Sequence, residues 1–458
     1  MTHQSATAAR HSLAPHFRAT LVLGLPMVGA MLAQILMSVT DTIMLGWLGA
    51  APLAASVLGT QIFLILLLTG SGFAQAVMPL AAHALGAGDT TVLRRAVRMG
   101  FWVTAAFSAF AFPVMWFAEP ILLLLGQEPA LAIMADQYLG IAKWALLPNL
   151  FIMVLRSYFG VVNKAHIVLV TTLFAAGFNA VLNYALIFGN WGAPALGIEG
   201  AAFATLGSSL LSMLLLMIVA NWHPALRPHA IFLRSWRSDW VAFFEVARVG
   251  WPIGISILAE FALFSFSAIM MGWFGTIALA AHGIVMQIIS VAFMVPLGLG
   301  QVATIRLGLA KGRKDADEIT VAGHTVLIVG IGFALAMSAL FLLVPAATIS
   351  LFLDFDNADA ADILAFAIPL LAVAAAFQLV DTLQVLAAGL LRGLKDTRVP
   401  MQIALFSYWV IGVPTAYLLS QFTALGPIGI WLGLAIGLTV ASLLGLWRYY
   451  LRAKIGLI

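Results

Sequence analysis

Four ionisable side chains lie inside long apolar stretches of this 458-residue chain: Asp41, Lys143, Glu260 and Asp381. A charge near the middle of a bilayer costs at least about 2.5 to 3.5 kcal/mol on insertion scales, so each needs a partner, a wet cavity or a function. Two carboxylates in one low-dielectric cleft favour a cation or a proton, because close negative charges do not both stay ionised without a counter-charge. Glu260 and Asp381 are therefore predicted to bind a coupling ion. A purely structural hydrogen-bonding role is the alternative.

Uncharged polar residues accompany the carboxylates. Gln34 and Asp41 are seven residues apart, and Asn179 and Asn183 are four apart, so each pair shares one face of a predicted helix. We expect both faces to line a water-filled interior. Na⁺ would use carboxylate, amide and carbonyl oxygens, and in that case Glu260 and Asp381 would be metal ligands. A proton would need only a buried carboxyl group, and the residues allow either ion.

Three further residues are candidate modulators of such a site. Lys143 either pairs with a carboxylate or extends towards the membrane interface. His282 either titrates near neutral pH and gates the cleft, or hydrogen-bonds in helix packing. Pro26 interrupts helix hydrogen bonding, as Pro252 does in the second half, and each is either a flexible or a static kink.

The composition indicates the elements that must hold these residues. The chain is 63% hydrophobic and 9% charged, whereas charged residues make up about a quarter of a soluble protein. It contains no cysteine, which excludes disulfides and cysteine-based catalytic or metal sites. Apolar runs of about 20 residues predict twelve membrane-spanning helices. They are 19–45, 53–80, 96–118, 133–157, 166–188, 197–220, 245–271, 278–303, 321–346, 362–389, 400–421 and 426–447.

The basic residues predict the orientation of these spans. Of the 22 Lys and Arg residues, 21 fall at the termini or in every second connection, and Lys143 is the exception. Because basic residues near span ends stay in the cytoplasm, both termini are predicted to be cytoplasmic, in a plasma membrane of the bacterial inner-membrane type. Arg94, Arg95 and Arg98 are interpreted as such orientation signals. The opposite side carries acidic residues, namely Glu119, Glu128, Glu199, Asp354, Asp356 and Asp359.

An internal repeat divides the spans into two sets of six. A shift of 226 residues aligns Pro26 with Pro252, and MLGWLGAAPLAA from Met44 with MMGWFGTIALAA from Met270, where seven of twelve positions are identical. Because each set has an even number of spans, the two have the same orientation. The predicted organisation is an N-terminal tail, an N-lobe, a cytoplasmic linker, a C-lobe and a C-terminal tail, at residues 1–17, 18–220, 221–244, 245–447 and 448–458.

The repeat also relates the polar residues of the two halves. Gln34 corresponds to Glu260, Gln61 corresponds to Gln287, and Asn149 corresponds to Asp381 at a shift of 232. Two amides in the first half therefore stand where the second half has two carboxylates. We predict a cation site in the second lobe and a separate single carboxylate, Asp41, in the first.

These segments resemble the multidrug and toxic compound extrusion family, in its NorM-like branch, from about residue 18 to residue 447. The resemblance lies in VTDTIMLGWLG after Pro26, FNAVLNYALIFG around Asn179 and Asn183, ILAEFALF around Glu260 and LAAHGIVMQI from Leu279. Its most specific part is FQLVDTLQVLAAGLLRGLKDTRVP from Phe377. Lys143 is not part of the family's pattern.

The resemblance implies an all-α integral membrane protein with twelve transmembrane helices in two pseudo-symmetric six-helix lobes around a central cleft. It implies an antiporter that exports organic cations in exchange for Na⁺ or H⁺ by alternating access. Carboxylates at the positions of Glu260 and Asp381 resemble the second-lobe cation site of the family. Asp41 with Asn179 and Asn183 resembles its first-lobe site. The full set of expected cleft residues is Glu260, Asp381, Asp41, Asn179, Asn183, Gln34, Asn149 and Gln287.

Two other functions compete with this one. A flippase of lipid-linked precursors would need basic side chains in its cavity, and a passive channel would never transport uphill. An enzyme or ATP-driven pump is not expected, because no G-x-x-x-x-G-K-[ST], H-E-x-x-H or G-x-S-x-G motif occurs. The expected partners are organic cations and membrane lipid, without nucleic acid. We expect a monomer that has no cofactor apart from the coupling ion.

Overall fold

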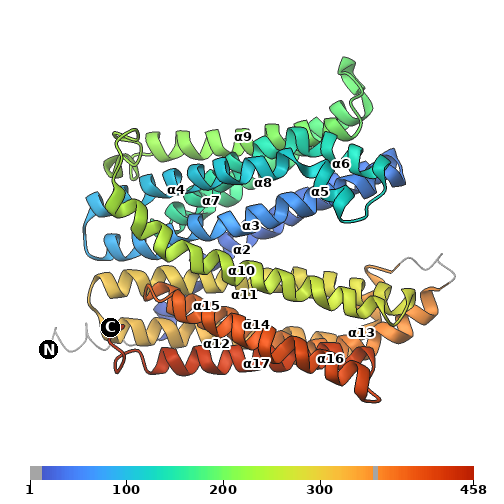
Figure 1. Ribbon diagram of the computed structural model, residues 1–458. Coiled ribbons are helices and arrows are strands. Elements are labelled where there is room, and N and C mark those ends of the chain that lie inside the picture. Colours follow the sequence, from blue (N-terminus) through green and yellow to red (C-terminus); the bar gives the residue numbers. More distant parts are fainter. Residues whose placement is uncertain (1–12, 354–358) are drawn as a thin grey trace. The chain divides into compact units, whose positions relative to one another are not determined.

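The computed structural model describes residues 13–353 and 359–458, and this part of the chain is built from helices and their connections (Figure 1). Within these residues, twelve helical segments are long and apolar enough to cross a membrane. The all-α class and the predicted number of spans are thereby confirmed. Arg10, Asp354 and Asp356 lie outside the described residues, as does most of the predicted tail 1–17.

The helices of the first half of the chain are connected by short turns. They are α2 (Leu13–Leu48), α3 (Ala50–Gly86), α4 (Thr90–Trp116), α5 (Ala118–Leu124), α6 (Pro129–Ala142), α7 (Leu146–Val161), α8 (Ala165–Phe188) and α9 (Ile198–Trp222). Short 3₁₀ turns are η1 (Lys143–Ala145), η2 (Asn190–Gly192) and η3 (Arg227–His229).

The second half follows the same order. Its helices are α10 (Trp240–Gly272), α11 (Thr276–Gly312), α12 (Ala316–Leu343), α13 (Pro345–Ser350), α14 (Ala360–Gly393), α15 (Arg398–Leu405), the π-helical turn η4 (Phe406–Gly412), α16 (Val413–Phe422) and α17 (Pro427–Tyr450).

Several helices extend well beyond the predicted apolar runs. α3 and α11 each contain 37 residues, which is about 55 Å at a rise of 1.5 Å per residue. The hydrocarbon core of a bilayer is only about 30 Å thick. Hydropathy marks this core, whereas the helix continues until its backbone hydrogen bonding ends. Arg306 and Lys311, expected beyond the span 278–303, therefore lie within α11.

Two of the predicted spans contain a local change of helix type. In the fourth span, the 3₁₀ turn η1 begins at Lys143 and separates α6 from α7. In the eleventh span, the π-helical turn η4 directly precedes α16, which has Pro414 in its first turn. Proline lacks a backbone N–H, so the preceding turn must satisfy its carbonyls in another way.

The chain packs into two compact units, and each boundary lies inside a long helix. One boundary lies in α2, between Val28 and Gly29, and the other lies in α10, between Gly254 and Ile255. Pro26 and Pro252, which the repeat aligns, each precede a boundary by two residues. Residues 29–254 form one unit, and α2 up to Val28 packs with residues from Ile255 onwards in the other.

In the unit of residues 29–254, α3 packs against α4 and α7, and α8 packs against α9. The first part of α10 crosses α3 at glycines. A Cβ atom added at Gly72 would lie 2.2 Å from the backbone nitrogen of Gly254, so no larger side chain fits without movement of a helix backbone.

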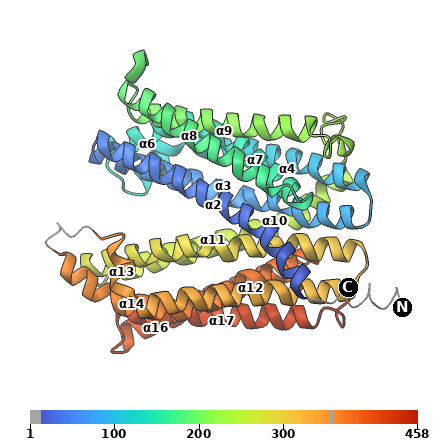
Figure 2. The same cartoon turned by 180° about the vertical axis from the view of Figure 1, so that it is seen from behind.

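In the other unit, α14 packs against α11, α12 and α17, around a core that includes Phe377 and Trp431. The first turns of α2 lie beside α12 (Figure 2). Val28 contacts Gly298, where an added Cβ atom would lie 2.5 Å from the Val28 side chain. A shift of 226 residues relates Gly72 to Gly298 and Val28 to Gly254, so the two units contain equivalent helix crossings.

Candidate functional site

The first group of predicted site residues surrounds Asp41. The helices α2 and α8 bring its carboxylate to the side-chain amides of Asn179 and Asn183, which are both fully buried. Asn183 Nδ2 donates to Asp41 Oδ1 over 2.5 Å and contacts Asn179 Oδ1 at 3.1 Å. Thr205 from α9 adds its hydroxyl, 3.5 Å from Asp41 Oδ2. The predicted grouping of Asp41 with the two asparagines is thus present.

This group also has unused hydrogen-bonding capacity. Among the described residues, Asn183 Oδ1 and Asn179 Nδ2 are buried without a hydrogen-bond partner. Leaving a buried polar atom unpaired costs about 1 to 3 kcal/mol. Asn183 Oδ1 and the Asp41 carboxylate are oxygens of the kind that Na⁺ takes. The same carboxylate can instead take up a proton.

The second group contains Glu260 on α10 and Asp381 on α14, and these two carboxylates interact electrostatically. Asp381 is 1% exposed. Arg392, eleven residues after Asp381 on α14, supplies a positive charge that interacts with Glu260. Tyr408 from η4 is fully buried and interacts with both carboxylates and with Arg392. Two carboxylates and one guanidinium therefore form one group that is connected electrostatically through Glu260.

One face of α14 presents polar oxygens around Asp381. Gln378 and Thr382 are fully buried, three residues before it and one residue after it. In the described part of the chain, Gln378 Oε1, Asp381 Oδ1, Thr382 Oγ1 and the Tyr408 hydroxyl are buried without hydrogen-bond partners. Carboxylate, amide and hydroxyl oxygens fit Na⁺, and water or a proton would satisfy the same atoms. Within the described residues, no group of three or more His, Cys, Asp or Glu side chains is placed to hold a metal ion.

Other predicted cleft residues lie elsewhere in the two units. Asn149 on α7 donates from Nδ2 to the Ala145 carbonyl at 2.8 Å and to Ser209 Oγ at 3.2 Å. It therefore links α7 to α9. Gln34 and Gln287 are both exposed, on α2 and α11. In the part of the chain that the structure describes, none of these three amides hydrogen-bonds to Asp41, Glu260 or Asp381.

The candidate modulators have apolar or aromatic surroundings. The Lys143 ammonium lies 3.8 Å from the ring centre of Trp116 and 5.6 Å from that of Phe112. This is a cation–π arrangement, which neither of the two predicted alternatives described. His282 is 2% exposed, and its ring centre is 5.5 Å from that of Trp431. Pro26 lies inside the continuous helix α2.

The sequence reasoning missed the residues that complete both groups. Arg392 could have been found from the sequence, because its spacing of eleven residues from Asp381 places both on one helix face. Gln378, three residues before Asp381, had a similar signal, whereas the spacing of one residue between Asp381 and Thr382 gave none. Thr205 and Tyr408 had none, because their helices meet the site only in the folded chain.

The segment between α9 and α10 is held against the start of α4. Arg94 Nε donates to the His229 carbonyl at 2.9 Å, and Arg95 forms an ion pair with Asp239. This hydrogen bond from Arg95 lowers the pKa of Asp239. The Tyr158 hydroxyl lies 2.7 Å from His229 Nδ1. Burial, followed by the charge of Arg94, lowers the pKa of His229.

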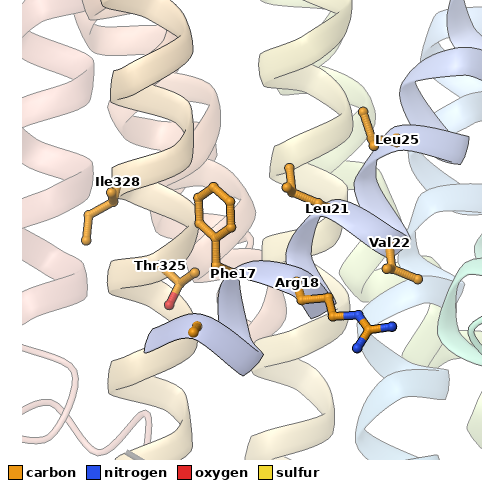
Figure 3. A pocket seen from close by; sticks show the side chains of 8 residues that line it. Phe17, Arg18, Leu21, Val22, Leu25, Thr325 and Ile328 are labelled. Carbon is orange, nitrogen blue, oxygen red and sulfur yellow. The ribbon is translucent and has the colours of Figure 1, made fainter. Parts of the chain in front are cut away.

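An apolar cavity of about 550 Å³ lies between the start of α2 and α12 (Figure 3). It is lined by Phe17, Leu21, Leu25 and Ile328, among other residues. The predicted site residues do not line it.

Comparisons with known proteins agree with these features. The sequence model of the MatE family matches residues 26–185 and 252–418. The two matches start 226 residues apart, which is the shift of the internal repeat. A "Probable multidrug resistance protein NorM" from Rhizobium meliloti (strain 1021) is 48% identical, over 95% of this chain and 93% of its own. A "Multidrug resistance protein NorM" from Burkholderia vietnamiensis is 36% identical, over 99% and 98%.

Solved structures show the same fold at lower sequence identity. A MATE protein in complex with MaL6 has a TM-score of 0.86 and 22% identity, over 96% of this chain and 97% of its own. A eukaryotic MATE transporter has a TM-score of 0.83 and 17% identity, over 97% and 100%.

Proposed function

Because the chain belongs to the MatE family, we propose that it is a secondary active multidrug efflux antiporter, which exports organic cations in exchange for Na⁺ or H⁺. It is an integral membrane protein and not an enzyme. The names of its relatives, which are multidrug resistance proteins, support small organic molecules as substrates. The coupling ion and the cationic character of the substrate are our own inference from the charged side chains.

The observation that carries this proposal is the group of Glu260, Asp381 and Arg392. When both carboxylates are ionised, the two carboxylates and one guanidinium leave a single excess negative charge inside apolar helices. Because an uncompensated charge is costly there, uptake of one monovalent cation stabilises the group. Either Na⁺ or H⁺ can supply that charge. An organic cation can supply it too, so the substrate and the coupling ion would compete for the same group.

Asp41 provides a second, separate site for the coupling ion. Its carboxylate is held by Asn183, and buried oxygen and nitrogen atoms remain beside it without partners. In the proposed cycle, an ion entering from outside binds these two groups and weakens the hold on the organic cation. Rearrangement of the two repeats then exposes the sites to alternate sides of the membrane. The predicted lobes 18–220 and 245–447, the tails and the linker 221–244 remain part of this proposal.

We further propose that the protein lies in a bacterial inner membrane, with both termini in the cytoplasm. The distribution of basic residues supports this orientation. We propose that it works as a monomer, since each carboxylate group is assembled from helices of a single chain. No cofactor enters the cycle apart from the coupling ion.

Transport into proteoliposomes tests this function. The purified protein is reconstituted, and movement of a fluorescent organic cation is followed with a Na⁺ gradient and no pH gradient, or the reverse. Uphill transport driven by one gradient alone identifies the coupling ion. Glu260→Gln and Asp381→Asn should abolish this coupling, whereas Glu128→Gln, at an exposed helix end, should not.

Three outcomes would contradict the proposal or its ion site. Flux that only equilibrates the dye under both gradients would indicate a channel. Absence of dye movement, together with movement of a lipid-linked pyrophosphate, would indicate a flippase. Wild-type coupling in both carboxylate variants would show that Glu260 and Asp381 do not form the ion site.

A further inference from the structure

A strongly basic cavity of about 360 Å³ lies where the α9–α10 connection meets the start of α4. Five arginines line it, three from α4 and two from the connection: Arg94, Arg95, Arg98, Arg234 and Arg237. One acidic side chain, Asp239, is also among the lining residues. Five positive charges thus converge on one lining carboxylate, and Asp89 and Glu245 also interact electrostatically with Arg95. The positive charges still outnumber these three carboxylates, and an anion in the cavity would offset the excess.

The orientation rule explains why these arginines are on one side of the membrane, but not why they converge. Convergence results from the folding of the connection onto α4. Arg98 Nη1 donates to the Arg234 carbonyl at 3.4 Å, and Trp102 Nε1 donates to the Ser235 carbonyl at 2.8 Å. The rings of Phe101 and Phe232 stack with centres 5.9 Å apart. These contacts hold the α9–α10 connection against α4 and so place Arg234 and Arg237 at the cavity.

Arg98 shows that the cavity has unused binding capacity. Its side chain lines the cavity, the residue is only 9% exposed, and in the described chain its Nε atom has no hydrogen-bond partner. Its approach to Asp239 is long, at 3.7 Å, while Arg95 bonds the same carboxylate closely. Asp239 is therefore engaged by Arg95, and Arg98 retains donors for another acceptor. A guanidinium group suits the oxygens of a phosphate, which it binds through two parallel hydrogen bonds.

From this geometry we propose that the cavity binds a phosphate group, which Arg98, Arg234 and Arg237 hold. The hydroxyl groups of Thr91 and Ser238, which also line the cavity, can donate to the remaining phosphate oxygens. A phosphate group could come from the headgroup of an anionic phospholipid or from a soluble phosphate.

The surroundings of the cavity favour the phospholipid headgroup. Trp236 is 78% exposed and Trp240 is 58% exposed, one on each side of Arg237 and Asp239 in the sequence. Tryptophan side chains gather at the level of lipid headgroups. The helix α10, which spans the membrane, begins at Trp240 directly after Asp239. The cavity therefore lies at the end of the membrane-spanning region.

Native mass spectrometry of the full chain in a neutral detergent tests the site. The protein is incubated with phosphatidylglycerol or with phosphatidylcholine of the same acyl chains, and bound lipid is counted. Arg237→Gln should reduce phosphatidylglycerol binding about fivefold, the factor that corresponds to about 1 kcal/mol per basic residue at an anionic surface. Arg227→Gln is the matched control, because Arg227 is exposed on the same connection but does not line the cavity.

A second arm distinguishes the sources of the phosphate. The thermal unfolding midpoint of each variant is measured with inorganic phosphate and with chloride at equal ionic strength. Selective binding of phosphatidylglycerol that Arg237→Gln weakens and Arg227→Gln does not supports a lipid headgroup. Stabilisation by inorganic phosphate with the same variant pattern, without lipid preference, supports a soluble phosphate. Equal behaviour of the three proteins towards both ligands would overturn the proposal.

Discussion

Asn183 on α8 donates a hydrogen bond to Asp41 on α2 over 2.5 Å, and so connects two membrane-spanning helices through a charge. A hydrogen bond to a charged group contributes about 1.5 to 3 kcal/mol. Asn183 Nδ2 also contacts Asn179 Oδ1, so the position of the carboxylate depends on both amides. This pair therefore connects ion uptake at Asp41 with the packing of α2 against α8.

The first prediction concerns this pair. Asp41→Asn removes the charge, and Asn183→Ala removes the donor and leaves the carboxylate poorly satisfied. Each should reduce ion-driven export at least about tenfold, since losing one charged hydrogen bond corresponds to at least that factor. The measurement is initial dye transport in proteoliposomes with equal amounts of folded protein. Normal transport in both variants would exclude Asp41 from coupling.

The second prediction concerns the charge balance around Arg392. In the double variant Glu260→Gln with Asp381→Asn, the guanidinium loses the Glu260 carboxylate with which it interacts, and the neighbouring Asp381 carboxylate is lost as well. A charge that has lost its counter-charge is costly among apolar helices. The unfolding midpoint in detergent should fall well below that of either single variant. Adding Arg392→Gln should restore much of the lost unfolding midpoint without restoring transport. A triple variant as unstable as the double variant would contradict the proposed charge interaction of Arg392.

The third prediction concerns the pH dependence of the α9–α10 connection. The pKa of His229 is lowered in the folded protein from its ordinary value of 6.5, so the fold favours the neutral ring. Its contribution to stability is complete above pH 6.5 and is lost as the pH falls through the lowered value. Hydrogen exchange of residues 227–239, corrected for intrinsic rates, should therefore increase on acidification below pH 6.5.

Two variants provide controls for this effect. His229→Gln removes the titrating ring and should flatten the pH dependence of exchange in that segment. His223→Gln removes another histidine from the same connection, outside the contact with Tyr158, and should leave the dependence unchanged. An unaltered pH dependence in His229→Gln would assign the effect to another group.

The fourth prediction concerns the crossing of α3 and α10. Gly72→Ala places a methyl group against the Gly254 backbone, and such overpacking typically costs about 1 to 3 kcal/mol. Gly140→Ala, on α6, has open space around the new methyl group and should be neutral or slightly stabilising. Thermal unfolding of both variants in detergent measures the difference. Equal unfolding midpoints for the two variants would show that α3 and α10 can move apart at this crossing without loss of stability.

Much of the architecture could be predicted from sequence, because hydropathy, basic residues and the repeat each act over many positions. The helix ends could not, since α11 continues past Arg306 to Gly312 by backbone hydrogen bonding that hydropathy does not detect. Asp41 and the two asparagines could be grouped because they resemble a family pattern. The positions of Asn149 and Lys143 depend on which side chains of other helices, Ser209 and Trp116, pack beside them.

The boundary inside α2 has a consequence for the order in which the protein is made. The first turns of α2 leave the ribosome early, but the residues that they pack against, such as Gly298 and Thr325, are synthesised almost 300 residues later. Arg306, which donates to Thr20 over 2.6 Å, is made equally late. Residues 29–254 can pack as soon as they are in the membrane. The first turns of α2 can pack against their partners only after the residues from Ile255 onwards have been synthesised.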